Sequence, residues 1–224
     1  MIVLGLTGSI AMGKTLAARQ FRSCGIPVYD ADKIVHFLLK EDQQVRFLIE
    51  NEFPDVLVNG KIDRLLLGNK VFNNQEPLQR LEGILHPRLR EYKAKFLRNN
   101  LIRRQRLVIL DIPLLFEKGG ELECDGVVVV SAPKFVQDHR VLKRPGMTKK
   151  KYLFILLQQL DDIEKRKKAD FIINSGLGKR ESLRKIRSII NLTRKWPQRN
   201  NGNRNKKYFQ RSTERPQICR AKLY

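Results

Sequence analysis

The clearest chemical signal in the sequence is a glycine-rich segment near the N-terminus. Residues 8–15 read Gly-Ser-Ile-Ala-Met-Gly-Lys-Thr and match the phosphate-loop pattern G-x-x-x-x-G-K-[S/T] at every fixed position. Gly8 and Gly13 permit backbone angles and close approaches that a side chain would block. The loop N–H groups and the start of the next helix would present positive potential to phosphate oxygens. We therefore expect Lys14 to reach the β- and γ-phosphates of ATP, and the Thr15 hydroxyl to bind Mg²⁺.

Three carboxylates follow predicted strands and are candidates for acid–base or metal chemistry. Asp30 and Asp32 flank Ala31 after one apolar segment, and Asp111 ends another. Ligands of open α/β sheets bind at the carboxyl ends of the strands. One acid of the first pair, with Asp32 favoured, could accept the proton of an attacking hydroxyl or hold Mg²⁺ through water, whereas the other interpretation is a helix cap. Asp111 resembles the metal-binding acid of phosphate-loop enzymes, or is an ordinary strand-end acid.

Basic residues suggest a mobile lid. Arg140 and Arg144 lie four residues apart, hence on one face of a helix, and Pro145-Gly146 follows as a hinge. Arginines that swing over a γ-phosphate neutralise charge in the transition state and exclude water, although a solvated basic face has the same spacing. Residues 165–168, Lys-Arg-Lys-Lys, are expected to form such a solvated face.

Alternating strands and helices would position these groups. Short apolar runs predict strands at 2–6, 26–29, 107–110, 126–130 and 171–173. Helical periodicity and capping signals predict helices at 15–24, 31–39, 64–72, 77–85, 87–101, 133–143, 148–161 and 181–192. Asp63 is the expected N-cap of the helix at 64–72. His86 is expected to leave helical geometry because Pro87 follows it. The pattern predicts a three-layer α/β fold with a parallel sheet and a helical insertion at about residues 40–100.

Length and charge define the class of protein. A chain of 224 residues suggests one domain with a small insertion, and its net charge of +22 favours anionic ligands. No apolar run approaches the ~20 residues of a membrane span, and three scattered cysteines fit a reducing cytoplasm. We expect a domain at 1–192, with the lid at about 137–150. Residues 193–224 hold ten basic residues and one acid, and are expected to be a disordered extension.

Eight segments occur in an order that resembles the dephospho-CoA kinase family. They are IVLGLTGSIAMGKT, GIPVYDADKIVH, IDRLLLGNKVF, LEGILHPRLRE, LDIPLLFE, VVVVSAP, QDHRVLKRPGMT and KADFIINSG. The phosphate loop is generic, but the DAD, HP, PLLFE and Q-x-x-R-x-x-x-R-P elements together are specific. The resemblance covers about residues 1–192. It implies a phosphate-loop kinase core with a helical acceptor-binding domain and a mobile lid.

The resemblance also implies a reaction and a set of site residues. ATP and 3′-dephospho-CoA would give ADP and CoA, with ATP and Mg²⁺ required and a monomer expected. The residues implied at the ATP phosphates are Gly8, Ala11, Met12, Gly13, Lys14, Thr15 and Leu16. Those implied at the acceptor are Asp30, Asp32, His86, Pro113, Leu114 and Leu115. Asp32 would be the base, and Arg140 and Arg144 would act on ATP from the lid.

The sequence departs from the family pattern in three places. Ala11 stands where the family usually has glycine, and Leu16 replaces a frequent second hydroxyl. The basic segment after residue 192 has no counterpart in the pattern. Two other functions stay open at this point: a kinase for another small acceptor, such as a nucleoside monophosphate, and a nucleic-acid-binding nucleotide hydrolase. The second is disfavoured because no RRM, KH or aromatic-stacking signature is found.

Overall fold

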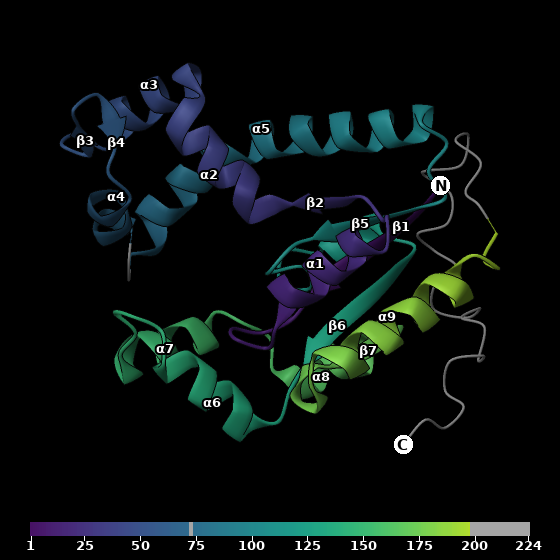
Figure 1. The fold of residues 1–224 in the computed structure, drawn as a ribbon. Coiled ribbons are helices and arrows are strands. Elements are labelled where there is room, and N and C mark those ends of the chain that lie inside the picture. The colour runs from purple at the N-terminus through teal and green to yellow at the C-terminus, as the bar shows by residue number, and fades with distance from the viewer. Residues whose placement is uncertain (72–73, 198–224) are drawn as a thin grey trace. The chain divides into compact units, whose positions relative to one another are not determined.

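A computed structural model describes residues 1–71 and 74–197 (Figure 1). The chain divides into two compact units. Unit 1 combines Met1–Tyr29 with the chain from Asn100 onward, and unit 2 is Asp30–Asn99. Unit 2 also contains the helix at 31–39, which lies before the expected insertion. Over the residues described, we find no helix that combines the length and the apolar character of a membrane span.

A five-stranded sheet forms the centre of unit 1, in the order β2-β5-β1-β6-β7. The strands are β1 (Ile2–Thr7), β2 (Val28–Asp30), β5 (Leu107–Asp111), β6 (Gly126–Ser131) and β7 (Phe171–Asn174). β1 pairs in parallel with β5 and β6, and β6 with β7. The predicted parallel α/β fold is therefore confirmed. Because β1 is central, the loop that follows it emerges at the middle of the carboxyl edge.

Helices cover this sheet. Unit 1 contains α1 (Lys14–Ser23), α6 (Lys134–Leu142), α7 (Lys149–Leu157), α8 (Asp162–Lys168), α9 (Lys179–Thr193) and the 3₁₀ turns η1 (Gly120–Glu123) and η2 (Ser175–Leu177). α1 and α9 share an apolar core with alternate strand residues such as Leu4 and Leu6 (Figure 1). On the opposite face, a Cβ on Gly5 would come within 2.6 Å of the Leu115 side chain, which shows how closely the third layer packs.

Unit 2 is mainly helical. It contains α2 (Ala31–Glu41), α3 (Gln43–Glu52), α4 (Arg64–Val71), a hairpin of β3 (Leu57–Val58) and β4 (Lys61–Ile62), and all but the last turn of α5 (Gln75–Ile102). Asp63 caps α4 as its position predicts, because its carboxylate accepts from the N–H groups of Leu65 and Leu66. The hairpin was not anticipated. Its turn residues, Asn59 and Gly60, both have positive φ, the conformation that an Asn-Gly turn favours.

The expected break at Pro87 is wrong: α5 continues through it. An internal proline costs about 3 kcal/mol because it removes a hydrogen bond and crowds the preceding turn. Burying one large apolar side chain returns about 1.5–3 kcal/mol. The apolar face of α5 continues on both sides of the proline in one cluster of unit 2, to which Leu81, Leu85, Leu89 and Tyr92 contribute. Several such side chains together outweigh the local cost.

Two further boundaries differ from those predicted. The helix expected at 148–161 ends at Leu157, and Asp161 starts α8 by accepting from the N–H of Ile163. The basic extension was expected from residue 193, yet Thr193 ends α9 and Trp196 packs against the core of unit 1. Residues 198–224 lie outside the described part of the chain, as does residue 72, which was expected to end α4.

Trp196 anchors the end of the described chain. Its ring stacks on Phe171 with centroids 5.6 Å apart, and a Cβ on Gly126 would come within 2.9 Å of it. We predict that Trp196→Ala lowers the free energy of unfolding by about 2 kcal/mol, because the ring is only partly buried. Urea unfolding would measure this change. Trp196→Phe, which keeps a ring on Phe171, should lose less than half as much, and equal losses would contradict a stacking role.

Candidate active site

The phosphate loop, residues 8–15, connects β1 to α1. Gly13 has φ +93° and precedes the first residue of α1, so a glycine is favoured there. Gly8 lies against β6, where a Cβ would come within 2.5 Å of the Val130 carbonyl oxygen. Glycine is therefore favoured at Gly13 by the backbone conformation and at Gly8 by the lack of space for a side chain.

Ala11 occupies the family's usual glycine position and also has a positive φ, 59°. A left-handed conformation costs a non-glycine residue roughly 1–2 kcal/mol. The methyl group is buried in a small apolar cluster with Val141 of α6 and Tyr152 of α7. This burial offsets part of the backbone cost, and the alanine joins the loop to α6 and α7.

Several amide groups of the loop are left for a ligand. The N–H of Ile10 donates to Gln159 Oε1 at 3.0 Å, and that of Met12 donates to the Ser9 carbonyl at 3.2 Å. The N–H groups of Ala11, Gly13 and Thr15 have no hydrogen-bond partner within residues 1–71 and 74–197. Donors at a helix start that are left unpaired in this way form a binding site for an anion.

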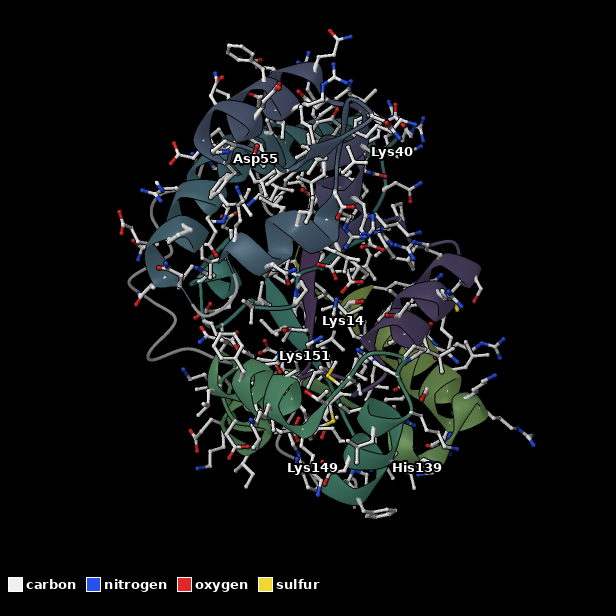
Figure 2. The ribbon with its side chains drawn as sticks, turned by 90° about the vertical axis from the view of Figure 1, so that its left-hand side faces the viewer. Lys14, Lys40, Asp55, His139, Lys149 and Lys151 are labelled. Atoms are coloured by element: carbon white, nitrogen blue, oxygen red, sulfur yellow. The ribbon has the colours of Figure 1, made fainter. Side chains whose placement is uncertain are left out.

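Lys14 forms an ion pair beside these amides. Its Nζ lies 2.7 Å from Asp111 Oδ1, at the end of the neighbouring strand β5. Lys14 is labelled in Figure 2 together with Lys149 and Lys151 of α7. Thr15, the next residue of α1, is exposed. The predicted Lys14, Thr15 and Asp111 are thus brought to the same edge of the sheet, where hydroxyl and carboxylate oxygens suit Mg²⁺.

The two arginines of the predicted lid, Arg140 and Arg144, differ in their surroundings. Arg140 donates to the Ser175 hydroxyl at 2.8 Å, to the Ser175 carbonyl at 3.0 Å and to the Ala11 carbonyl at 3.4 Å. These bonds hold Arg140 against the phosphate loop. Arg144 lies after α6, and its side chain is exposed. The two arginines therefore do not form one uniform basic face.

A three-residue polar cluster joins α6 to α7. Lys134 Nζ lies 2.7 Å from Asp138 Oδ1 and 2.6 Å from the Tyr152 hydroxyl, which donates to Asp138 at 2.6 Å. Hydrogen bonds from Lys134 and Tyr152 hold the pKa of the Asp138 carboxyl below its ordinary value. The cluster therefore keeps its ion pair at neutral pH and ties α6 to α7.

The segment after Asp111 divides between surface and core. Pro113 and Leu114 are partly exposed, and the Pro113 carbonyl accepts from the Thr7 hydroxyl at 2.7 Å. Leu115 has no exposed surface. Its side chain fills the layer beneath β1, and its expected contact with the acceptor stays a prediction. Glu117 Oε1 accepts from the N–H of Leu160 at 2.8 Å.

The remaining candidates belong to unit 2. Asp30 is the N-cap of α2, where its carboxylate accepts from the Lys33 N–H at 3.1 Å. Asp32 lies in the first turn of α2 and is exposed. His86 is exposed on α5. The capping interpretation therefore holds for Asp30.

Three residues at the loop were not singled out from the sequence. Gln137 and Ser175 donate to the Ile10 and Met12 carbonyls, and Gln159 accepts from the Ile10 N–H. Gln137 and Ser175 fall within segments that carry the family resemblance, so the motif itself was the available signal. The residue type of an uncharged side chain does not predict which backbone group it will bond. Only the fold shows that these three side chains bond the phosphate loop.

Comparisons with known proteins identify the family. The sequence model of dephospho-CoA kinases matches residues 2–179. The chain is 46% identical over 190 residues to a dephospho-CoA kinase from Bartonella quintana, covering 85% of this chain and 97% of that one. It is also 46% identical over 195 residues to one from Rhodospirillum rubrum, covering 86% and 92%. The chain belongs to the dephospho-CoA kinase family.

The fold of this chain is also similar to those of solved structures. A crystal structure from Thermus thermophilus is similar with a TM-score of 0.73 and 34% identity, covering 88% of this chain and 98% of that one. The dephospho-CoA kinase from Campylobacter jejuni follows with a TM-score of 0.56 and 29% identity, covering 85% and 96%. Membership of the dephospho-CoA kinase family decides against the nucleoside monophosphate kinase and the nucleic-acid-binding hydrolase.

One correction concerns the basic run at 165–168. Lys165 was expected to be solvated, but it has no exposed surface, and its Nζ lies 2.9 Å from Glu117 Oε1. Lys167 pairs with Glu164 at the surface with 67% of its side chain exposed. A run of like charges cannot reveal by itself which member turns inward.

These two lysines offer a matched comparison. We predict that Lys165→Ala lowers the free energy of unfolding by about 3 kcal/mol, because Glu117 is left largely buried without its ion-pair partner. Lys167→Ala should change it by less than about 0.5 kcal/mol, since an exposed pair contributes little. Urea unfolding of both variants measures the difference. Equal effects would mean that the buried pair does not stabilise the fold.

Proposed function

We propose that the chain uses ATP to phosphorylate the ribose 3′-hydroxyl of dephospho-CoA, giving CoA and ADP in the last step of CoA biosynthesis. The phosphate loop carries this proposal. The amides of Ala11, Gly13 and Thr15 are without partners in the described chain, beside Lys14, in a member of the dephospho-CoA kinase family. Preorganised donors of this kind stabilise charge on a transferring phosphoryl group.

Lys14 supplies positive charge at the β- and γ-phosphates. Phosphoryl transfer passes through a loose transition state, so positioning and charge compensation dominate catalysis. The Asp111 carboxylate, 2.7 Å away, holds the Lys14 side chain at the edge of the sheet before ATP binds. Less side-chain freedom is then lost on binding.

Mg²⁺ would be held by the Thr15 hydroxyl together with phosphate oxygens. Among residues 1–71 and 74–197, no three His, Cys, Asp or Glu side chains gather into a metal site. This agrees with an ion that arrives with ATP, because Mg²⁺ often binds through substrate phosphates and few protein ligands. The bound ion would neutralise charge on the phosphates.

Asp32 is the proposed base that accepts the proton of the ribose hydroxyl. Asp30 uses its carboxylate to cap α2, whereas Asp32 is exposed in the first turn of the same helix. Asp32 follows β2, a strand of the central sheet, and ligands of such sheets bind beyond the carboxyl ends of the strands. A positioned carboxylate contributes roughly 10²–10⁴-fold to the rate.

The other proposed contacts divide between acceptor and ATP. Asp30, His86, Pro113, Leu114 and Leu115 would shape the acceptor site. Arg144 is the proposed lid residue that reaches the γ-phosphate, because its side chain is exposed next to the Pro145-Gly146 hinge. Arg140 would act closer to the loop, to which it already bonds. We expect the enzyme to work as a monomer in the cytoplasm.

The phosphate-loop lysine gives the first test of this mechanism. We predict that Lys14→Ala lowers kcat at least about 100-fold, because charge compensation in the transition state is lost. Lys40→Ala is the control, since Lys40 is an exposed lysine of α2 paired with Glu41 (Figure 2). Steady-state kinetics at saturating ATP measures both. Turnover of Lys14→Ala equal to that of the control would remove Lys14 from the mechanism.

The proposed base gives the second test. Asp32→Asn should lower kcat by about 10²–10⁴-fold without changing the unfolding midpoint, because the amide cannot accept the proton. Asp55→Asn is the matched control, since Asp55 is an exposed residue with a left-handed backbone that asparagine also tolerates (Figure 2). A loss of less than tenfold for Asp32→Asn would remove this residue from the role of base.

The activity itself is tested with an acceptor panel. ADP release from Mg²⁺–ATP would be measured with dephospho-CoA, AMP, CMP, gluconate and no acceptor. We expect ADP only with dephospho-CoA, together with the formation of CoA. Turnover with another acceptor alone would keep the kinase chemistry but reject the proposed substrate.

A further inference from the structure

Three consecutive carbonyls of the phosphate loop each accept a hydrogen bond from a side chain outside the loop. Gln137 Nε2 donates to the Ile10 oxygen at 2.9 Å, and the Ser175 hydroxyl donates to the Met12 oxygen at 2.6 Å. Between them, the Arg140 guanidinium donates to the Ala11 oxygen at 3.4 Å. The loop is therefore held along its outer side by α6 and η2.

Ser175 is the most constrained of these donors. Its side chain is buried, at 6% exposure, in the first residue of η2. Arg140 donates to its hydroxyl oxygen at 2.8 Å, and a guanidinium cannot accept a hydrogen bond. The Ser175 hydroxyl hydrogen is therefore directed to Met12. A Cβ on Gly13 would come within 2.9 Å of this hydroxyl oxygen, so Ser175 lies directly against the loop.

Holding a carbonyl also fixes an amide, because the C=O of one residue and the N–H of the next point in opposite directions across a trans peptide. The Met12 carbonyl shares its peptide with the Gly13 N–H, and the Ile10 carbonyl shares its peptide with the Ala11 N–H. Gly13 and Ala11 carry two of the N–H groups without a partner in residues 1–71 and 74–197. Ser175 and Gln137 thus hold the peptides of these two donors.

We propose that Ser175 and Gln137 are positioning residues for ATP: by bonding the Met12 and Ile10 carbonyls, they aim the Gly13 and Ala11 amides at the phosphates. This inference rests on the proposed function of the loop in binding phosphates. Neither side chain needs to touch the nucleotide. Removal of either donor frees its peptide to turn, so the preorganised donor is lost while the charge of the site stays unchanged.

The test compares binding of ADP with binding of AMP, which has no β-phosphate. Isothermal titration calorimetry would measure both on the full chain as wild type, Ser175→Ala and Gln137→Leu. We expect each variant to bind ADP about fivefold or more weakly, as the loss of one net hydrogen bond implies, and AMP within about twofold of wild type. The KM for ATP should rise by a similar factor, with a smaller change in kcat.

Ser182→Ala is the matched control. Ser182 is also a buried serine, 2% exposed, and its hydroxyl donates to the Gly178 carbonyl at 3.0 Å within the start of α9. It should leave the ratio of ADP to AMP affinity unchanged. If Ser175→Ala does not fold, Gln137→Leu tests the same inference from a different element.

The outcomes separate this inference from the proposed function. A wild-type chain that does not prefer ADP to AMP would contradict phosphate binding by the loop, and with it both proposals. A wild-type preference that neither variant reduces would overturn the positioning role alone. Equal losses of ADP and AMP affinity in the variants would also overturn it, because a general loss of structure does not act through the β-phosphate.

Discussion

The site in unit 1 depends on the direction in which the backbone N–H groups of the phosphate loop point. A phosphate can approach the loop only if side chains stay out of its way and the amides face it. Gly8 has a neighbouring carbonyl 2.5 Å from where a Cβ would lie, and Gly13 adopts φ +93° against Ser175. The central place of β1 in the sheet brings this loop between the ends of β5 and β6, where Lys14 meets Asp111.

The elements that come later in the chain complete the loop. α6 contributes Gln137 and Arg140, and η2 contributes Ser175, so the outer side of the loop is bonded by residues more than 100 positions away. The burial of the Ala11 methyl group against Val141 and Tyr152 adds an apolar contact to the same junction. Because the predicted lid and the phosphate loop share these bonds, a movement of the lid would also act on the loop.

Local rules failed where long-range packing gave the larger energy. Pro87 was expected to break a helix, but the continuous apolar face of α5 carries the helix through it. Lys165 was expected to be solvated, but it is buried with Glu117. In each case the residue type and its neighbours in sequence were known. The residues that it packs against or pairs with lie elsewhere in the chain, and they determine its structure.

The sequence by itself determined the parallel α/β fold, the phosphate loop and the family, because apolar periodicity and fixed glycine spacing are local properties of the chain. It also placed Asp111 at a strand end and Asp63 at a helix start, since both positions follow from nearest neighbours. The tertiary structure alone decided which lysine of the basic run is buried and which side chains hold the loop carbonyls. Those outcomes depend on hydrogen bonds and burial between residues far apart in sequence, and no local pattern contains the distance between them.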